Sequence, residues 1–198
     1  KKKKHEHFSY LSLYAVEKCF ELNGLKVFDV EELPTHGGSL RVWAQKAAGT
    51  RSETQNLRDL RAKETKAGIA TLACYDGFDT KVRAIRRNLL DFLQKAKTAG
   101  KTVAAYGAAA KGNTLLNYCA IDNGLIDFVV DANPHKQNTL LPGSHIPVHA
   151  PDKLKASKPD YVLILPWNLQ NEIMKDVSYV KDWGGQFLVA VPEVEVVG

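Results

Sequence analysis

The stretch Tyr106-Gly107-Ala108-Ala109-Ala110-Lys111-Gly112-Asn113 decides the fold. It follows the apolar run 102–106, which is typical of a short buried strand, and it leads into a helical pattern over about 112–121. Where a strand passes through a glycine loop into a helix, the free N–H groups at the helix start favour an anion such as a pyrophosphate. The glycines do not follow the GxGxxG spacing, so a tight turn with Asn113 as helix cap is the alternative to ligand binding.

Further strands and helices are predicted around this loop. The other apolar, strand-like runs are 126–130, 160–165 and 186–191. An amphipathic pattern from about residue 80 to Gly100 predicts a long helix, and 168–180 predicts another. Continuous apolar strands that alternate with helices are typical of a parallel sheet covered on both faces. We therefore predict that residues 80–198 form an α/β, Rossmann-like domain with a mostly parallel sheet.

Three segments precede this domain. Over residues 5–46 we predict a helix followed by a small β-hairpin. Apolar residues recur at helical spacing up to Asn23-Gly24, and two strand patterns follow. Residues 47–79 are polar over most of their length, which is typical of a linker or of a solvent-facing helix that Gly68 would end. Residues 1–4 are a lysine run, which we set aside as a tail or an artefact.

Charge, cysteine content and hydropathy argue against several classes of partner and site. The net charge is +5, but Lys1 to Lys4 supply four of these charges, so the basic balance does not indicate a nucleic-acid partner. The three cysteines are widely spaced and have no companion histidine, which fits a reducing compartment and predicts no metal site here. No apolar run approaches the roughly 20 residues that span a bilayer. We expect a cytoplasmic protein with neither a nucleic-acid nor a membrane partner.

Polar and aromatic residues follow the ends of three predicted strands, which in a parallel sheet share one edge. Asp131 lies 24 residues after Gly107, about where a ribose-binding acid belongs. The alternative to ligand contact is a role as helix N-cap for Asn168 and packing in the core for Trp167. The residues of this edge predicted to contact a ligand are Gly107, Lys111, Asn113, Asn133, Lys136, Trp167 and Asn168.

Two histidine motifs lie in the N-terminal segment. His5-Glu6-His7 places two imidazoles around a carboxylate, which suits proton transfer better than metal ligation, because a third ligand is missing. A polar chain end without a role is the alternative. The turn at His36 is either a simple hairpin turn or a nest of backbone N–H groups, which with His36 and Arg41 would lie beside a ligand.

Six motifs occur in a fixed order along the chain: His5–Tyr10, Glu31–Arg41, Tyr106–Asn117, Val130–Gln137, Leu141–Pro147 and Leu163–Asn168. Together they resemble the C-terminal domain of the S-adenosylmethionine-dependent sugar C-methyltransferases, which act on nucleotide-linked keto-deoxysugars. The resemblance runs from His5 to the end of the chain. A set of ordered motifs is more specific than any one of them alone.

The resemblance implies an architecture and a mechanism. Complete members carry a zinc-binding N-terminal domain and a domain for S-adenosylmethionine, and we expect both outside this sequence, so that this chain alone transfers no methyl group. His7 matches the proposed base, which removes the proton next to the sugar ketone, and Glu6 matches its acidic neighbour. His36, Arg41 and the glycine loop would face the nucleotide sugar. Lys4 stands where the family usually has a tyrosine. A stand-alone nucleotide-binding module without catalysis is the alternative function.

Overall fold

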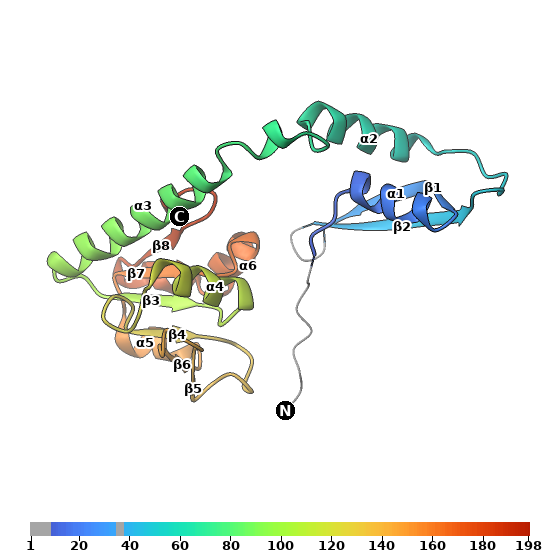
Figure 1. Cartoon of the computed structure of the whole chain (residues 1–198). Helices are drawn as coiled ribbons and strands as arrows, with labels where there is room; N and C mark the ends of the chain where they lie inside the picture. The colour runs from blue at the N-terminus through green and yellow to red at the C-terminus, as the bar shows by residue number, and fades with distance from the viewer. Residues whose placement is uncertain (1–8, 35–37) are drawn as a thin grey trace. The chain divides into compact units, whose positions relative to one another are not determined.

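The computed structural model describes residues 9–34 and 38–198, which divide into two compact units. The first unit ends at Phe78, and the second runs from Asp79 to Gly198 (Figure 1). Within the described ranges, no helix combines the length and the apolar character that crossing a membrane requires.

The first unit packs two helices against an antiparallel hairpin. The helices are α1 (Leu13–Leu22) and α2 (Gln55–Ala67), and the hairpin strands are β1 (Leu25–Leu33) and β2 (Ser39–Lys46). Both helices contact β1, and they contact each other. The buried core consists of Leu13, Val27, Val30, Leu57 and Leu60. The predicted helix and hairpin are therefore both present, and this small core holds them together.

The ends of the two helices follow from local sequence. Helix α1 begins at Leu13, where the Ser12 hydroxyl accepts a hydrogen bond from a backbone N–H, and it ends at Asn23 and Gly24 as predicted. The polar segment after the hairpin contains helix α2, which Gly68 ends with a φ of 72°. Because Leu57 and Leu60 are buried, α2 has an apolar face and is not solvent-facing all round.

The second unit is built on a seven-stranded sheet with the strand order β5-β6-β4-β3-β7-β8-β9. The strands are β3 (Val103–Tyr106), β4 (Phe128–Val130), β5 (Thr139–Leu140), β6 (Pro147–His149), β7 (Tyr161–Ile164), β8 (Gln186–Val189) and β9 (Glu195–Val197). The five central strands are parallel, and only the edge strands β5 and β9 pair antiparallel. The predicted mostly parallel sheet is confirmed.

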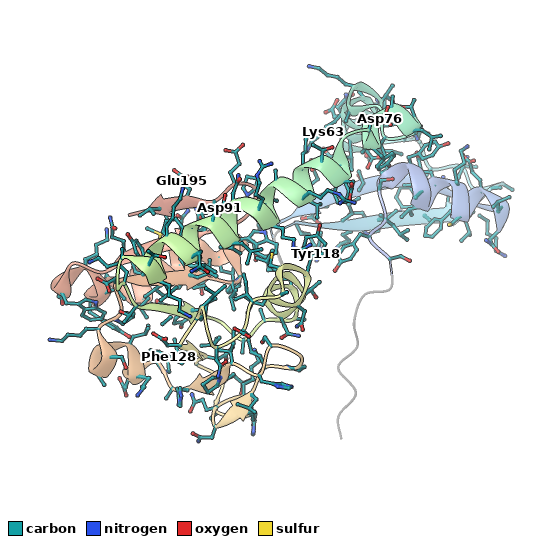
Figure 2. The ribbon with its side chains drawn as sticks, turned by 60° about the vertical axis from the view of Figure 1, so that its left-hand side comes forward. Lys63, Asp76, Asp91, Tyr118, Phe128 and Glu195 are labelled. Atoms are coloured by element: carbon teal, nitrogen blue, oxygen red, sulfur yellow. The ribbon has the colours of Figure 1, made fainter. Side chains whose placement is uncertain are left out.

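Helices cover both faces of this sheet. The helical elements are α3 (Phe78–Thr98), α4 (Ala110–Cys119), α5 (Asp152–Ser157), η3 (Trp167–Leu169), α6 (Gln170–Asp176) and η4 (Ser178–Trp183). Apolar residues of α3 and α4 share one core with Leu163 of β7, whereas α5, α6 and η4 share the other core with Val162 and Ile164. Asp91 of α3 and Tyr118 of α4 are exposed (Figure 2). Successive residues of one strand thus enter opposite cores, as a buried parallel strand requires.

The structure differs from the prediction in three respects. The short helix η2 (Leu72–Tyr75), helix α5, and strands β5, β6 and β9 were not predicted. The single helix predicted over 168–180 consists of three short pieces, because the backbone leaves helical geometry at Leu169 and again at Val177. Helix α4 begins at Ala110, two residues earlier than predicted.

Candidate functional site

The glycine loop lies at the carboxyl edge of the parallel sheet, between β3 and α4. The Gly107 N–H donates a 2.7 Å hydrogen bond to the Val130 carbonyl at the end of β4. The Leu165 N–H, just after β7, donates a 3.0 Å hydrogen bond to the Tyr106 carbonyl. The loops that follow three neighbouring strands are therefore joined at one edge, where ligands bind in open α/β sheets.

Asp131, directly after β4, organises this edge. Its Oδ2 accepts hydrogen bonds from the Ala108 N–H at 2.7 Å and from the Lys136 ammonium at 2.9 Å. Its Oδ1 accepts a third from the Asn133 N–H at 2.8 Å. The side chain is 11% exposed. The acid expected to contact a ribose is thus bonded to its own chain, where it holds the glycine loop and balances the charge of Lys136.

Both glycines of the loop are packed against the segment that follows β7. A Cβ at Gly107, whose φ is 91°, would lie 2.6 Å from Pro166 Cδ, and a Cβ at Gly112 would lie 2.5 Å from Leu165 Cβ. Real Cβ contacts are not this short, so the neighbouring chain requires glycine at both positions. The sequence analysis predicts that Gly107 contacts a ligand, and the atoms nearest to Gly107 and Gly112 in the structure belong to the protein.

Lys111 places a cation at the same edge. Its ammonium lies 4.6 Å from the centroid of the Trp167 ring and donates a hydrogen bond to Asn168 Oδ1. Burial lowers the pKa of Lys111. Within the described ranges Lys111 takes part in no salt bridge. The N-cap alternative for Asn168 is wrong, because Pro166 and Leu169 are the N-caps of η3 and α6.

Two side-chain oxygens near α4 are buried without a partner among the described residues, namely Asn113 Oδ1 and Ser144 Oγ. Asn113 is the fourth residue of α4, and Ala109 is the N-cap, so the capping alternative for Asn113 is also wrong. A buried acceptor without a donor is costly, which makes Asn113 Oδ1 available to a ligand donor. By contrast, Asn133 is exposed, and its Oδ1 accepts the His135 N–H at 2.9 Å.

Tyr106, the last residue of β3, was not among the predicted ligand-contacting residues. Burial raises the pKa of its phenol, and the charges of Asp176, Asp131 and Glu172 act in the same direction. The hydroxyl therefore stays protonated at neutral pH and is a hydrogen-bond donor. The sequence signal that could have identified Tyr106 is its position, since it is an aromatic residue at the junction of strand and glycine loop.

The remaining predicted site residues belong to the first unit. His5, Glu6, His7 and His36 lie outside the described residues. Arg41 lies on β2 and is exposed. Its guanidinium pairs with Glu31 at 2.9 Å and lies 5.9 Å from the centroid of the Trp43 ring. The charge of Arg41 is therefore already balanced across the hairpin.

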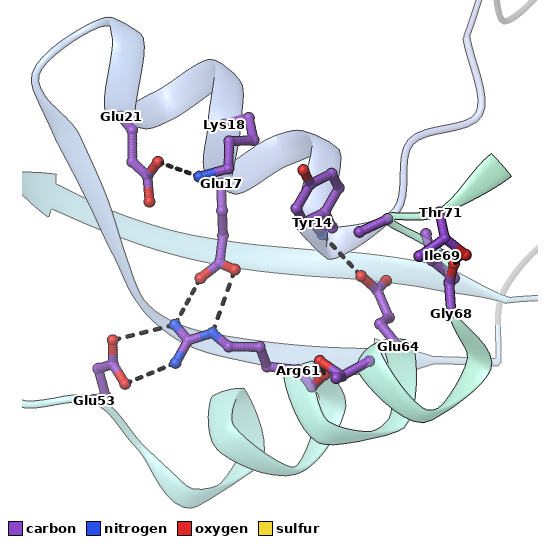
Figure 3. Close-up of a pocket in the computed structure, with 12 residues that line it drawn as sticks. Tyr14, Glu17, Lys18, Glu21, Glu53, Arg61, Glu64, Gly68, Ile69 and Thr71 are labelled. Atoms are coloured by element: carbon purple, nitrogen blue, oxygen red, sulfur yellow. Dashed lines mark hydrogen bonds and ion pairs between the residues drawn. The ribbon is translucent and has the colours of Figure 1, made fainter.

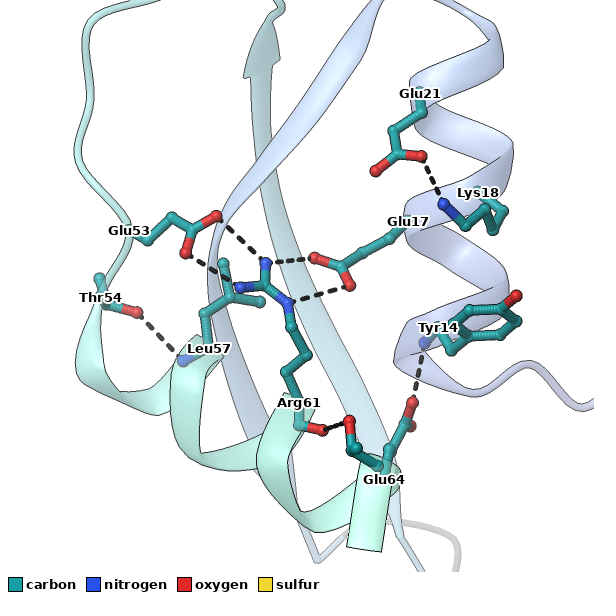
Figure 4. Close-up of polar contacts among 10 residues, drawn as sticks. Tyr14, Glu17, Lys18, Glu21, Glu53, Thr54, Leu57, Arg61 and Glu64 are labelled. Atoms are coloured by element: carbon teal, nitrogen blue, oxygen red, sulfur yellow. Dashed lines mark hydrogen bonds and ion pairs between the residues drawn. The ribbon is translucent and has the colours of Figure 1, made fainter. Parts of the chain in front are cut away.

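A cavity of about 510 Å³ lies between α1 and α2 (Figure 3). Four carboxylates line it, from Glu17, Glu21, Glu53 and Glu64. Each is bonded within the protein, to Arg61, to Lys18 or to the start of α1 (Figure 4). Residues 9–34 and 38–198 contain no cluster of three or more His, Cys, Asp or Glu side chains placed to hold a metal ion.

The chain was compared with known protein families. The model of the C-methyltransferase C-terminal domain family matches residues 34–192. The chain belongs to this family. The glycine loop, Asp131, Lys111 and Trp167 of this C-methyltransferase domain all lie inside the matched region, whereas the His5–His7 motif precedes it. The resemblance inferred from the ordered motifs is confirmed at the level of the family.

Two individual proteins are similar to this chain. C-methyltransferase NovU from Streptomyces niveus is 37% identical over 193 residues, which cover 98% of this chain and 46% of NovU. The chain therefore spans about half the length of that relative. Among solved structures, UDP-D-quinovosamine 4-dehydrogenase from Vibrio fischeri is similar with a TM-score of 0.38 and 16% identity, over 50% of this chain and 93% of that one. A likeness this low carries no argument.

Proposed function

We propose that this chain is the C-terminal, acceptor-binding part of an enzyme that methylates a carbon of a nucleotide-linked keto-deoxysugar. Membership of the family supports carbon methylation. The ordered motifs support S-adenosylmethionine as the donor, bound by another domain, with zinc only in an N-terminal domain beyond this sequence. The observation that carries the acceptor role is the Lys111 ammonium over Trp167 at the carboxyl edge of the sheet.

The chemistry of this edge suits a sugar nucleotide. A diphosphate needs cations and N–H donors, and the edge offers Lys111 beside the start of α4. Lys136 is neutralised by Asp131, which leaves Lys111 as the cation that is not paired with a carboxylate among the described residues of the edge. An indole such as Trp167 offers an apolar ring face to a base or sugar. We retain Gly107, Asn113, Asn133 and the two lysines, with Asn168, as proposed acceptor contacts.

The reaction begins with His7 as the proposed base. Its imidazole takes the proton from the carbon next to the ketone, and the electron pair of the broken C–H bond moves toward the ketone oxygen. The enolate formed in this way needs hydrogen-bond donors at its oxygen, because the C–H group is a far weaker acid than the imidazolium that the proton transfer creates. Glu6 would orient His7. S-adenosylmethionine would supply the methyl group as a sulfonium electrophile: the new C–C bond would form as the S–CH3 bond breaks, and S-adenosylhomocysteine would leave as the neutral thioether.

We also place the protein in the cytoplasm. Cys19 and Cys74 are free and exposed, which fits a reducing compartment.

A matched pair of lysine substitutions tests the acceptor site. Lys111→Gln removes the cation over Trp167, and Lys155→Gln removes a cation that lies 4.7 Å from the Tyr179 ring centroid elsewhere in the unit. Calorimetric titration with a thymidine diphosphate keto-deoxysugar is expected to give about tenfold weaker binding for Lys111→Gln, the loss of one charge-assisted contact. The Lys155→Gln control should bind as the wild type does. Equal dissociation constants for all three proteins would contradict the proposal.

The proposed base requires the complete enzyme. His7→Ala is expected to abolish methyl transfer and to leave the dissociation constant of the sugar nucleotide within about twofold, because the proposed contacts of the sheet edge remain. Near-normal turnover of His7→Ala would remove His7 from the mechanism.

A further inference from the structure

The hydroxyl of Tyr106 is not used by the bonds that hold the second unit together. Tyr106 is the half-buried last residue of β3, and its ring packs against the core that the sheet shares with α5, α6 and η4. Among the residues that the structure describes, none is hydrogen-bonded to this hydroxyl. By contrast, the Tyr179 hydroxyl, on the same face of the sheet, donates to the Pro151 carbonyl at 3.5 Å. The Tyr106 hydroxyl is therefore available to a ligand.

The charges around Tyr106 indicate what kind of ligand group it can bind. Burial is the main cause that raises the pKa of its phenol, and Asp176, Asp131 and Glu172 raise it further, because their negative charges oppose ionisation. Asp131 is balanced by Lys136. Glu172 and Asp176 lie four residues apart on α6, and within the described ranges neither forms a salt bridge. These carboxylates repel an anion, so the group that suits the Tyr106 hydroxyl is neutral.

One helical segment connects the surroundings of Tyr106 with the proposed diphosphate site. Trp167, at the start of η3, has its ring centroid 4.6 Å from the Lys111 ammonium. Six residues later, Ile173 of α6 enters the core against which Tyr106 packs. Tyr106 and Lys111 are five residues apart in the chain, so their Cα atoms are separated by at most about 18 Å. A single extended ligand can therefore reach both side chains.

The two ends of this path differ in charge. Lys111 is a cation that has no carboxylate partner within the described ranges, whereas Tyr106 is an uncharged donor beside carboxylates. A nucleotide-linked keto-deoxysugar has the same division, because its diphosphate is anionic and its sugar is neutral. Complementary charges orient a ligand as well as attract it. The charges of this edge thus favour one direction of the acceptor, with its sugar toward Tyr106.

We propose that Tyr106 binds the sugar part of the acceptor, by donating a hydrogen bond to a carbonyl or hydroxyl oxygen of the neutral ring. The proposal rests on the proposed function, because it assigns a contact within the acceptor site that Lys111 and Trp167 form. Tyr106 is then a residue that determines specificity. A nucleotide without the sugar gains nothing from the Tyr106 hydroxyl, whereas it keeps the whole contact with Lys111.

The test compares two ligands by calorimetric titration of the complete enzyme and three variants. The ligands are thymidine diphosphate and a thymidine diphosphate keto-deoxysugar. Tyr106→Phe removes the hydroxyl and keeps the ring, and Lys111→Gln removes the cation. Tyr161→Phe is the matched control, since Tyr161 is also half-buried but lies beside Val103, at the opposite end of the parallel strands.

Tyr106→Phe is expected to raise the dissociation constant of the sugar nucleotide about fivefold, which corresponds to the loss of one hydrogen bond. Its dissociation constant for thymidine diphosphate should stay within twofold of wild type. Tyr161→Phe should bind both ligands as the wild type does. Binding of the sugar nucleotide that is equal in Tyr106→Phe and wild type overturns the proposal. So does an equal loss for both ligands, because Tyr106 would then act on the nucleotide part.

Lys111→Gln separates failure of this inference from failure of the proposed function, since it should weaken both ligands about tenfold. If Lys111→Gln weakens both while Tyr106→Phe weakens neither, only the role of Tyr106 falls. If Tyr106→Phe weakens the sugar nucleotide alone while Lys111→Gln weakens neither ligand, the diphosphate contact is wrong and the sugar contact stands. If neither variant changes any dissociation constant, the proposed acceptor site is wrong, and this inference falls with it.

Discussion

Replacing Asp131 by asparagine should loosen the glycine loop and destabilise the second unit. The carboxylate accepts three hydrogen bonds, from the Ala108 and Asn133 N–H groups and from the Lys136 ammonium. In Asp131→Asn one of the two oxygens becomes an NH₂ group, which cannot accept. If Oδ2 is the oxygen replaced, the Ala108 N–H is left buried without an acceptor, and Lys136 faces a donor.

The size of the effect follows from these contacts. A hydrogen bond to a charged group contributes about 1.5–3 kcal/mol, and a buried donor left without an acceptor costs about 1–3 kcal/mol. The Lys136 side chain is 28% exposed, so solvent screens part of its pairing. We therefore expect Asp131→Asn to lower the free energy of unfolding by about 3 kcal/mol. For a domain of this size, that corresponds to roughly 10 °C in melting temperature.

Urea denaturation at neutral pH measures this difference. The matched control is Asp152→Asn, whose carboxylate is 91% exposed and lies 3.8 Å from the Lys155 ammonium. The control is expected to leave the denaturation midpoint where it is in the wild type, because exposed pairs contribute little. The reasoning is refuted if Asp131→Asn and Asp152→Asn unfold at the same urea concentration.

Two further changes test the packing and the electrostatics of the sheet. Gly112→Ala should destabilise the second unit by about 1–3 kcal/mol, because its Cβ would lie 2.5 Å from Leu165 Cβ; a urea midpoint equal to that of wild type would show that α4 shifts freely. The Lys101 hydrogen bond, followed by that of the Thr102 N–H, lowers the pKa of Asp160 below its ordinary value of 3.8. The stabilisation by Asp160 is therefore present at neutral pH and lost as the pH falls through the lowered pKa. The difference in stability between wild type and Asp160→Asn should accordingly shrink between pH 5 and about pH 2, and a difference that stays constant over this range would count against the ion pair.

Much of the second unit could be predicted because its strands are apolar on both sides. The run 160–165 contains Val162, Leu163 and Ile164, which enter two different cores, and such a run is recognisable without partners. Strands β5 and β6 have only two and three residues. Their strand geometry comes from pairing with each other and with β4, which periodicity cannot reveal.

The candidate site was less predictable than the fold, because its geometry depends on residues far apart in the chain. The predicted parallel sheet places Lys111 and Trp167 at the same edge, and the structure brings the two side chains into contact. The requirement for glycine at 112 arises from Leu165, 53 residues later. Likewise, the bond between Asp131 and the Ala108 N–H spans 23 residues, and the spacing alone indicated a ribose ligand instead.

The central claim is that this chain holds the acceptor and not the methyl donor. Thermal unfolding of the chain with increasing thymidine diphosphate keto-deoxysugar, and separately with S-adenosylmethionine, tests it most directly. A ligand of the folded state at 100 times its dissociation constant stabilises by about 2.7 kcal/mol. We predict that the sugar nucleotide raises the melting temperature accordingly, and that S-adenosylmethionine leaves it unchanged. Stabilisation by S-adenosylmethionine, with no response to the sugar nucleotide, would contradict the account.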